Sequence, residues 1–193
     1  MDEARCRVLI LLAHPSLHRS RINVVMRNAV KGIPGVTLHE LYDAYPDFFI
    51  NVQYEKALLL EHQLLVFQHP LYWYSVPPIL KLWQDVVLER GFAYGEGGDA
   101  LQGKELMQAI STGGKVESFS REGNNYFTMD ELLFPMQATA RRCGMIYRPP
   151  LVIHDGYDQT DAAIEQHAQC YRDLLLAYTR EGSQLFESTA EKN

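Results

Sequence analysis

Short apolar runs alternate with stretches of helical periodicity along nearly the whole chain. Five runs have the composition of strands, at residues 7–13, 36–42, 64–68, 106–111 and 151–154. Helical patterns lie after them, at residues 20–30, 53–62, 79–87, 128–143 and 161–180. Strands that are apolar on both faces and separated by helices form a parallel sheet that is covered on both sides. The pattern therefore predicts an α/β fold.

Right-handed crossovers leave few ways to arrange such strands. We expect one five-stranded parallel sheet of order 2-1-3-4-5 with helices on both faces. The 193 residues are enough for a single domain, with a frayed polar tail from about residue 181. Pro135 predicts a kink or a late start of its helix. In this strand order the carboxyl ends of strands 1, 3 and 4 lie together, which is where open α/β sheets bind ligands.

Composition and charge exclude several classes of protein. The net charge is −6 and the basic residues do not cluster, so nucleic-acid binding is not expected. The three cysteines are far apart and lack metal-binding spacing, which predicts a reducing compartment and no metal site. No run reaches the ~18 apolar residues of a membrane span. We expect a cytoplasmic protein, which can still dock on a membrane protein at the inner face of the cell membrane.

The loop after the first strand, residues 14–23, leads into a helix. A helix amino terminus presents unpaired N–H groups and a partial positive charge, so it attracts phosphate. Side chains that can donate hydrogen bonds occur at His14, Ser16, His18, Ser20 and Asn23. The loop has no glycine, so it is neither a P-loop nor a dinucleotide-binding fingerprint. A polar loop with Ser20 as an ordinary N-cap explains the same residues equally well.

Three consecutive aromatic residues, Tyr72, Trp73 and Tyr74, follow the third strand. Aromatic residues usually pack in the core, whereas this position is at the ligand-binding edge of the predicted sheet. We interpret the segment as a stacking surface for a planar ring, whose polar edge would meet backbone N–H groups from Leu71 onward. The alternative is a hydrophobic corner packed beneath the next helix.

The turn after the fourth strand, residues 111–114, ends in Gly113-Gly114. Paired glycines let the backbone approach a ligand closely, although a turn that merely needs positive φ uses them too. A phosphate loop, an aromatic turn and a glycine edge at one end of a sheet together predict a flavin site. In such a site NAD(P)H delivers hydride, leaves, and is replaced by the acceptor, which is a ping-pong cycle.

Four segments resemble the flavodoxin-like NAD(P)H:quinone oxidoreductases of the DT-diaphorase type. They are residues 11–14, 67–81, 91–94 and 111–114, and the second is highly specific. The resemblance covers about residues 7–180. It implies FMN as the cofactor, with FAD as the alternative, and NAD(P)H as the co-substrate.

Within that family, three segments resemble the ancillary oxidoreductases of the bacterial glutathione-gated potassium-efflux (Kef) systems, at residues 41–48, 94–98 and 135–140. Those relatives are homodimers that bind FMN, reduce quinones and electrophiles, and activate the efflux antiporter. The resemblance therefore implies a homodimer, a quinone or electrophile substrate, and a membrane antiporter as partner.

Carried over by position, the resemblance implies a set of FMN contacts. They are His14, Ser20, Arg21, Ile22 and Asn23 around the phosphate, and Leu71, Tyr72, Trp73, Tyr74, Ser111, Thr112, Gly113 and Gly114 around the isoalloxazine ring.

Three positions depart from the family pattern, and the first is Tyr72, where many quinone reductases have glutamine. DT-diaphorase-type enzymes have a tyrosine and a histidine after the glycine pair that stabilise the reduced flavin, and Phe119 and Asn125 stand at the matching positions here. Phe119 cannot donate a hydrogen bond. Catalytic residues therefore stay unassigned, with Tyr72 and the backbone at Gly113 and Gly114 as candidates.

Two other functions fit the same residues less well. The loss of the two relay residues favours a regulatory binding module, in which the flavin site mainly shapes a surface for the antiporter. One-electron carriage is disfavoured by the mildly acidic charge and the broad aromatic turn. Among single residues, His39, His62 and His167 are expected at the surface. His69 is expected either to support the site or to be purely structural.

Overall fold

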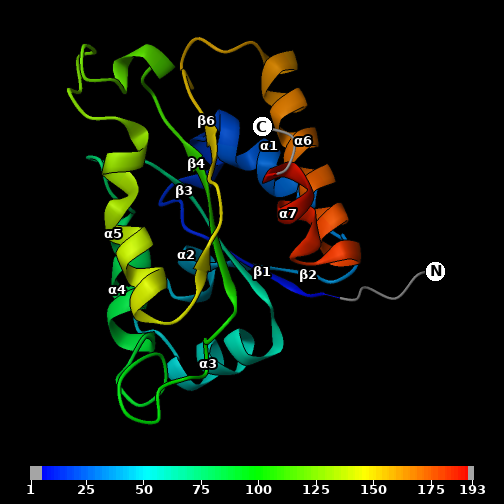
Figure 1. The fold of residues 1–193 in the computed structure, drawn as a ribbon. Helices are drawn as coiled ribbons and strands as arrows, with labels where there is room; N and C mark the ends of the chain where they lie inside the picture. Colours follow the sequence, from blue (N-terminus) through cyan, green and yellow to red (C-terminus); the bar gives the residue numbers. More distant parts are fainter. Residues whose placement is uncertain (1–5, 191–193) are drawn as a thin grey trace.

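A parallel sheet lies between two layers of helices in the computed structural model, which describes residues 6–190 (Figure 1). The strands are β1 (Val8–Leu12), β2 (Val36–Glu40), β3 (Leu64–Pro70), β4 (Glu105–Ser111), β5 (Ile146–Tyr147) and β6 (Leu151–Ile153). All pairings are parallel, the order is β2-β1-β3-β4-β5, and β6 also pairs with β4. The predicted fold class and strand order are confirmed.

Helices cover both faces of the sheet, as predicted. They are α1 (Arg21–Val30), α2 (Leu41–Ala44), α3 (Val52–Glu61), α4 (Pro78–Val87), α5 (Met129–Arg142), α6 (Asp161–Glu181) and α7 (Gln184–Ala190). Figure 1 shows α1, α6 and α7 on one face and α4 and α5 on the other. Among the described residues, no helix has both the length and the apolar character needed to cross a membrane.

Each strand contributes to two hydrophobic cores because successive side chains point to opposite faces. Leu9 and Leu11 of β1 pack with residues of α3, α4 and α5 in one core. Val8 and Ile10 pack with α1 and α6 in the other. Burial of β1 on both faces is what fixes it in the interior of the sheet, with its carboxyl end at the ligand-binding edge.

The strand expected at residues 151–154 is present as β6, and a two-residue strand that was not predicted, β5, precedes it. Two short pieces, β5 and β6, both pair with β4. Pro149 and Pro150 lie between them and have no N–H to donate to a neighbouring strand. The prolines explain the interruption, and β6 keeps the edge in place next to the carboxyl end of β4.

Two further expectations about helices need correction. Helix α5 starts at Met129, directly after a capping box between Thr128 and Glu131, and continues through Pro135, so it has no late start. The expected frayed tail instead contains α7. Phe186 of α7 packs against Tyr178 with ring centroids 6.0 Å apart, and this apolar contact anchors the helix.

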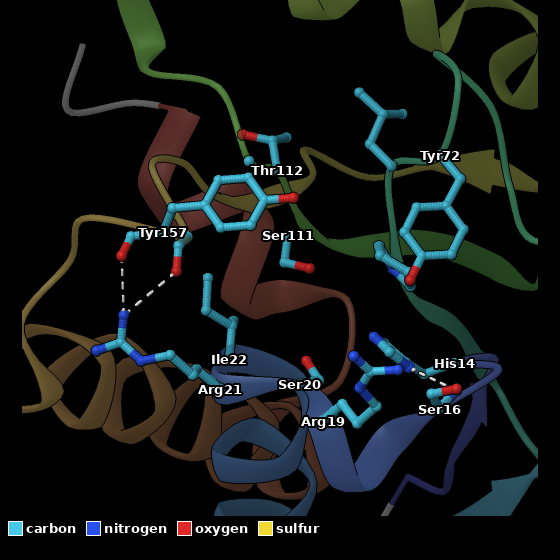
Figure 2. A pocket seen from close by; sticks show the side chains of 14 residues that line it. His14, Ser16, Arg19, Ser20, Arg21, Ile22, Tyr72, Ser111, Thr112 and Tyr157 are labelled. Atoms are coloured by element: carbon cyan, nitrogen blue, oxygen red, sulfur yellow. Dashed lines mark hydrogen bonds between the residues drawn. The ribbon is translucent and has the colours of Figure 1, made fainter.

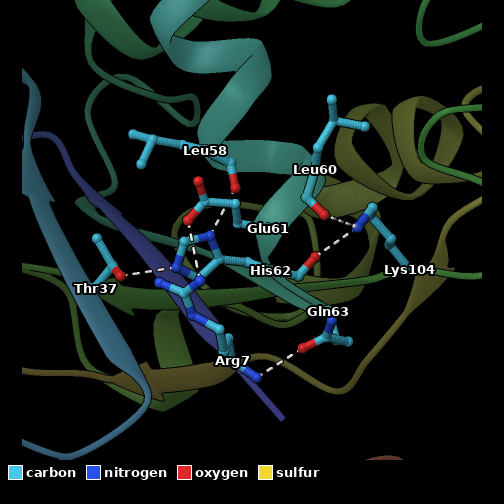
Figure 3. Close-up of polar contacts among 8 residues, drawn as sticks. All are labelled: Arg7, Thr37, Leu58, Leu60, Glu61, His62, Gln63 and Lys104. Atoms are coloured by element: carbon cyan, nitrogen blue, oxygen red, sulfur yellow. Dashed lines mark hydrogen bonds and ion pairs between the residues drawn. The ribbon is translucent and has the colours of Figure 1, made fainter.

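The opposite end of the sheet is closed by a polar cluster at the end of α3 (Figure 3). Lys104 donates to the carbonyl groups of Leu60 and His62 at 3.2 and 2.7 Å. His62 is only 2% exposed and contacts the Leu58 carbonyl and the Thr37 hydroxyl. The expectation that His62 lies at the surface is wrong, because its ring ties α3 to β2.

Candidate functional site

The turns after β1, β3 and β4 meet at one end of the sheet, as the strand order requires. Pro70 pairs with Ser111 in the β3–β4 ladder, and the Leu71 N–H donates to the Ser111 carbonyl at 2.8 Å. Leu12 pairs with Gln68, so His14 reaches the level of Pro70 two residues later. A main cavity of about 500 Å³ opens between these turns (Figure 2).

A side cavity of about 220 Å³ adjoins the main cavity through shared lining residues Leu71, Thr112 and Gly113. Twelve of the thirteen predicted contacts line one cavity or the other. Those at the main cavity are His14, Ser20, Arg21, Ile22, Leu71, Tyr72, Ser111, Thr112 and Gly113. Trp73, Tyr74 and Gly114 line only the side cavity. The exception is Asn23, which is fully buried beneath the site.

One end of the main cavity is formed by the start of α1. The Ser20 hydroxyl caps this helix by accepting the Asn23 N–H at 3.0 Å. The Ser16 N–H donates to His14 Nδ1 at 3.1 Å, and burial lowers the pKa of His14 below its ordinary value. A neutral ring that accepts at Nδ1 carries its proton at Nε2. Arg19 also lines the cavity, so this end offers donors and positive charge.

The Arg21 guanidinium makes its hydrogen bonds to other parts of the protein and does not point into the cavity. It donates to the carbonyl groups of Gly156, Tyr157 and Gln159 at 3.5, 3.1 and 2.8 Å, and to the Asp161 carboxylate at 2.7 Å. Figure 2 shows it directed toward the Tyr157 loop. Arg21 therefore clamps the loop after β6 onto the first turn of α1.

The aromatic turn is a strained hairpin turn. Tyr72 and Ser75 exchange backbone hydrogen bonds of 3.0 Å in both directions, and Trp73 and Tyr74 between them have φ angles of 47° and 63°. Positive φ at both central positions defines a type I′ turn, which normally uses asparagine and glycine. The turn holds the Trp73 side chain 94% exposed, so the indole does not block the main cavity.

The glycine pair is needed for space, since neither Gly113 nor Gly114 has positive φ. A Cβ on Gly113 would lie 2.5 Å from Cε2 of Tyr157. A Cβ on Gly114 would lie 3.3 Å from the Phe119 ring. The alternative explanation, a turn that merely needs positive φ, is therefore wrong. The absence of a side chain at Gly113 lets the Tyr157 ring lie close to the backbone.

The loop after β6 completes the site and was not predicted. The Asp155 and Gly156 N–H groups donate to the carbonyls of Gly114 and Thr112, both at 2.9 Å. Gly156 and Tyr157 line the main cavity opposite Tyr72 (Figure 2). The sequence carried a signal, because this loop also follows a strand at the same edge of the sheet.

Of the three positions that depart from the family pattern, Tyr72 lines the main cavity, and Phe119 and Asn125 lie at the side cavity. Phe119 packs against His154 with ring centroids 5.2 Å apart, and Asn125 accepts a hydrogen bond of 3.1 Å from the Tyr74 hydroxyl. His69 lines neither cavity. It is fully buried, which lowers its pKa to about 4, and Gln108 donates to its Nε2 at 3.1 Å. Its other ring nitrogen contacts the Pro70 carbonyl at 3.0 Å.

Comparison with known proteins agrees with this geometry. The family described as "Flavodoxin-like fold" matches residues 6–175. The glutathione-regulated potassium-efflux system ancillary protein KefG of Yersinia enterocolitica is 44% identical over 169 residues, which are 88% of this chain and 92% of that protein. KefG of Erwinia tasmaniensis is 41% identical over the same share of each chain.

Solved structures are similar over nearly the full chain. General stress protein 14 of Treponema denticola, in complex with FMN, is 35% identical with a TM-score of 0.85, over 90% of this chain and 99% of that one. An NADPH-quinone reductase of P. pentosaceus is 34% identical with a TM-score of 0.80, over 91% and 98%. A thermophilic tryptophan halogenase from Streptomycin violaceusniger is 43% identical with a TM-score of 0.85, over 87% of this chain and 98% of that one.

The family match extends over all three turns and the loop after β6, so it includes the whole site and not the sheet alone. The chain belongs to the flavodoxin-like NAD(P)H:quinone reductase family and is a homologue of the potassium-efflux ancillary protein KefG.

Proposed function

We propose that the protein is an FMN-dependent oxidoreductase that transfers hydride from NAD(P)H to quinones or other electrophiles in a ping-pong cycle. We further propose that it acts as a homodimer and activates a glutathione-gated potassium-efflux antiporter, at which it would bind from the cytoplasm. The main observation in support is that one cavity joins donors at the start of α1 to the aromatic and glycine turns after β3 and β4.

The residues of the cavity fit a flavin phosphate. None of the residues lining the main cavity is acidic, and Arg19, Ser20 and His14 offer a cation and hydrogen-bond donors beside the α1 amino terminus. Helix amino termini with such donors favour phosphate. The volume of about 500 Å³ lies within the range of roughly 300–1,000 Å³ for small-molecule sites. FMN fits this description, and FAD would need a further groove for its adenylate.

The other end of the site fits a planar ring. Tyr72 lies on one side of the main cavity and Tyr157 on the other (Figure 2). Because Gly113 has no side chain, the Tyr157 ring can lie close to its backbone. A bound flavin supplies the hydride chemistry, and the protein positions it and excludes water. The side cavity, with Trp73 and Tyr74, lies next to this end and would receive the nicotinamide or the quinone in turn.

The direct test is a spectrum followed by turnover. Purified protein should bind one FMN per chain and become yellow, NAD(P)H alone should bleach it, and a quinone should restore the colour. Phe49→Ala should leave all three colour changes intact and is the matched control for aromatic variants in the site. Phe49 is an exposed aromatic residue that lines neither cavity. A colourless protein that cannot be reconstituted with FMN or FAD would contradict the assignment.

A second candidate function is a regulatory module with little turnover. Phe119 and Asn125 favour it, because they replace the residues that stabilise the reduced flavin in the resembling enzymes. Trp73→Ala separates the two functions, since it removes an exposed wall of the side cavity. Potassium efflux and quinone turnover should fall together if catalysis drives activation. Activation that survives a complete loss of turnover would favour the module.

A further inference from the structure

The structure assigns to Asn23 the role of a positioning residue, which fixes the hydroxyl groups of Ser20 and Ser111 as donors to an anionic group in the main cavity. This inference rests on the proposed function, where the anionic group is the phosphate of the flavin. It differs from a direct contact between Asn23 and the ligand, because Asn23 has no exposed surface.

The contacts of Asn23 join two distant parts of the chain. Its Nδ2 donates to the Ser111 Oγ at 2.8 Å and lies 3.4 Å from the Ser20 Oγ. Its backbone N–H donates to the same Ser20 Oγ at 3.0 Å. One buried amide therefore holds the start of α1 against the carboxyl end of β4, directly beneath the cavity.

These contacts determine what the two hydroxyl groups can offer. A serine hydroxyl has one proton to donate and two lone pairs that accept. Both Oγ atoms accept from Asn23, and neither proton has an acceptor within residues 6–190. Ser20 and Ser111 both line the main cavity (Figure 2). Their protons are therefore available to a ligand.

The chemistry of the ligand follows from this arrangement. Two O–H donors beside a helix amino terminus, in a cavity with no acidic lining residue, favour an acceptor with negative charge. The Oδ1 atom of Asn23 has no partner among the described residues, so the amide acts here through its NH₂ group. A side chain of the same shape that only accepts would draw both protons away from the cavity.

Asn23→Asp is that side chain, and FMN and riboflavin are the matched ligands, because they differ by the phosphate. We expect the ratio of FMN affinity to riboflavin affinity, measured by flavin fluorescence, to fall about 10-fold to 100-fold, since hydrogen bonds to charged groups are lost. A purely structural role would weaken both ligands equally and leave the ratio unchanged, which would overturn the inference.

A serine-free background separates positioning from charge repulsion. Ser20→Ala combined with Ser111→Ala should lower the ratio by itself, and adding Asn23→Asp should then change it little. If Asn23→Asp lowers the ratio equally far in that background, repulsion explains the effect and the inference is wrong. Asn23→Ala, which adds no charge, should lower the ratio by a smaller factor. If Asn23→Asp does not fold, Asn23→Ala still decides the question, because an unchanged ratio of affinities in Asn23→Ala would also overturn the inference.

Inorganic phosphate distinguishes a failure of this inference from a failure of the proposed cofactor. Amide shifts at the start of α1 should respond to phosphate in the wild-type protein and respond more weakly in Asn23→Ala. Phosphate binding without flavin binding would overturn the cofactor and keep the inference. Flavin binding with equal affinity for FMN and riboflavin would keep a flavin site and overturn the inference.

Discussion

Gly113 and Tyr157 touch because Gly113 has no side chain. The Tyr157 ring is 83% exposed, and within the described residues its hydroxyl group has no hydrogen-bond partner. Its backbone, in contrast, is fixed by Arg21 and by the strand edge at Thr112. The backbone of Tyr157 therefore has a defined position beside the cavity, while its ring is free to change orientation.

Gly113→Ala should change ligand binding more than stability. The new Cβ would meet the Tyr157 ring at 2.5 Å, and an exposed ring can swing aside at a cost in folding free energy of less than about 1 kcal/mol. The displaced ring then lies differently at the cavity, and we expect FMN affinity to fall about tenfold, or about 1.4 kcal/mol. Fluorescence titration and thermal unfolding measure the two effects.

Gly114→Ala is the matched comparison, because its Cβ would meet Phe119 at 3.3 Å and Ser118 at 3.8 Å but would not meet Tyr157. Tyr157→Ala should rescue Gly113→Ala if the contact with the ring is the cause. A loss of affinity that persists in the double variant would show that the added methyl group itself occupies the ligand's place.

At the scale of elements, the first turn of α1 organises the site. Arg21 on its outer side binds the loop after β6, and Asn23 on its inner side binds the end of β4. The two residues connect segments more than 80 residues away. The sequence predicted that α1 begins at this turn, since Ser20 is an N-cap. It could not predict these partners, because local patterns carry no information about contacts between remote loops.

Arg21→Ala should loosen the loop after β6 with little effect on global stability. The ion pair with Asp161 is exposed, and exposed pairs contribute roughly 0–1 kcal/mol. The hydrogen bonds to three carbonyl groups hold the loop locally, so amide exchange at residues 155–160 should become faster. Hydrogen-exchange mass spectrometry checks this. Unchanged exchange in the loop, with lower stability elsewhere, would show that Arg21 has no clamping role.

Glu55, a buried residue of α3, joins its helix to three other parts of the chain. Its carboxylate accepts hydrogen bonds from Trp83 of α4 and His39 of β2, each at 2.7 Å, and from the Tyr45 hydroxyl. Burial raises the pKa of this carboxyl group, but the three donors outweigh it, so the pKa lies below its ordinary value. A carboxylate with lowered pKa stabilises the fold above pH 4.5, and that contribution is lost at lower pH.

Glu55→Gln should destabilise the protein by about 3 kcal/mol at neutral pH, because it leaves buried donors without their charged acceptor. Urea unfolding measures the change. Glu61→Gln is the control, since Glu61 forms an exposed ion pair with Arg7, and it should cost less than about 1 kcal/mol. If both variants behave alike, the buried cluster contributes no more than a surface pair.

At the scale of the whole molecule, the sheet and its edge were predictable and the finer geometry was not. Apolar runs and helix caps identified the layers, and the strand order then brought the three turns together. The turn with positive φ at Trp73 and Tyr74 could not be predicted, because it lacks the asparagine and glycine that are typical of such turns. Tyr157 was not predicted, although its loop follows an expected strand that ends at the same edge of the sheet. Pro149 and Pro150 directly precede that short strand, β6, which delivers the loop to the site.

Acid should destabilise the molecule as a whole, because burial lowers the pKa of His14, His62, His69 and His154. A histidine that is neutral in the fold contributes stability above pH 6.5, and this contribution falls as the pH drops toward the folded pKa. For His69, with a pKa of about 4, the loss reaches about 2 kcal/mol at pH 5.

Urea unfolding between pH 7.5 and pH 5 tests this expectation. His69→Gln should reduce the loss of stability over that range, even if the variant is less stable at pH 7.5. His18→Gln is the control, because His18 is exposed. A wild-type protein whose stability is constant over the range would contradict the assignment of neutral buried histidines.

The unusual turn after β3 also gives the protein a built-in optical probe. The chain has two tryptophans; the ring of Trp83 is sealed in the core, and that of Trp73 stands in solvent beside the side cavity. Their emission spectra should differ in wavelength and in sensitivity to dissolved quenchers. Occupancy beside the site can therefore be followed without any attached dye, through the indole that solvent reaches.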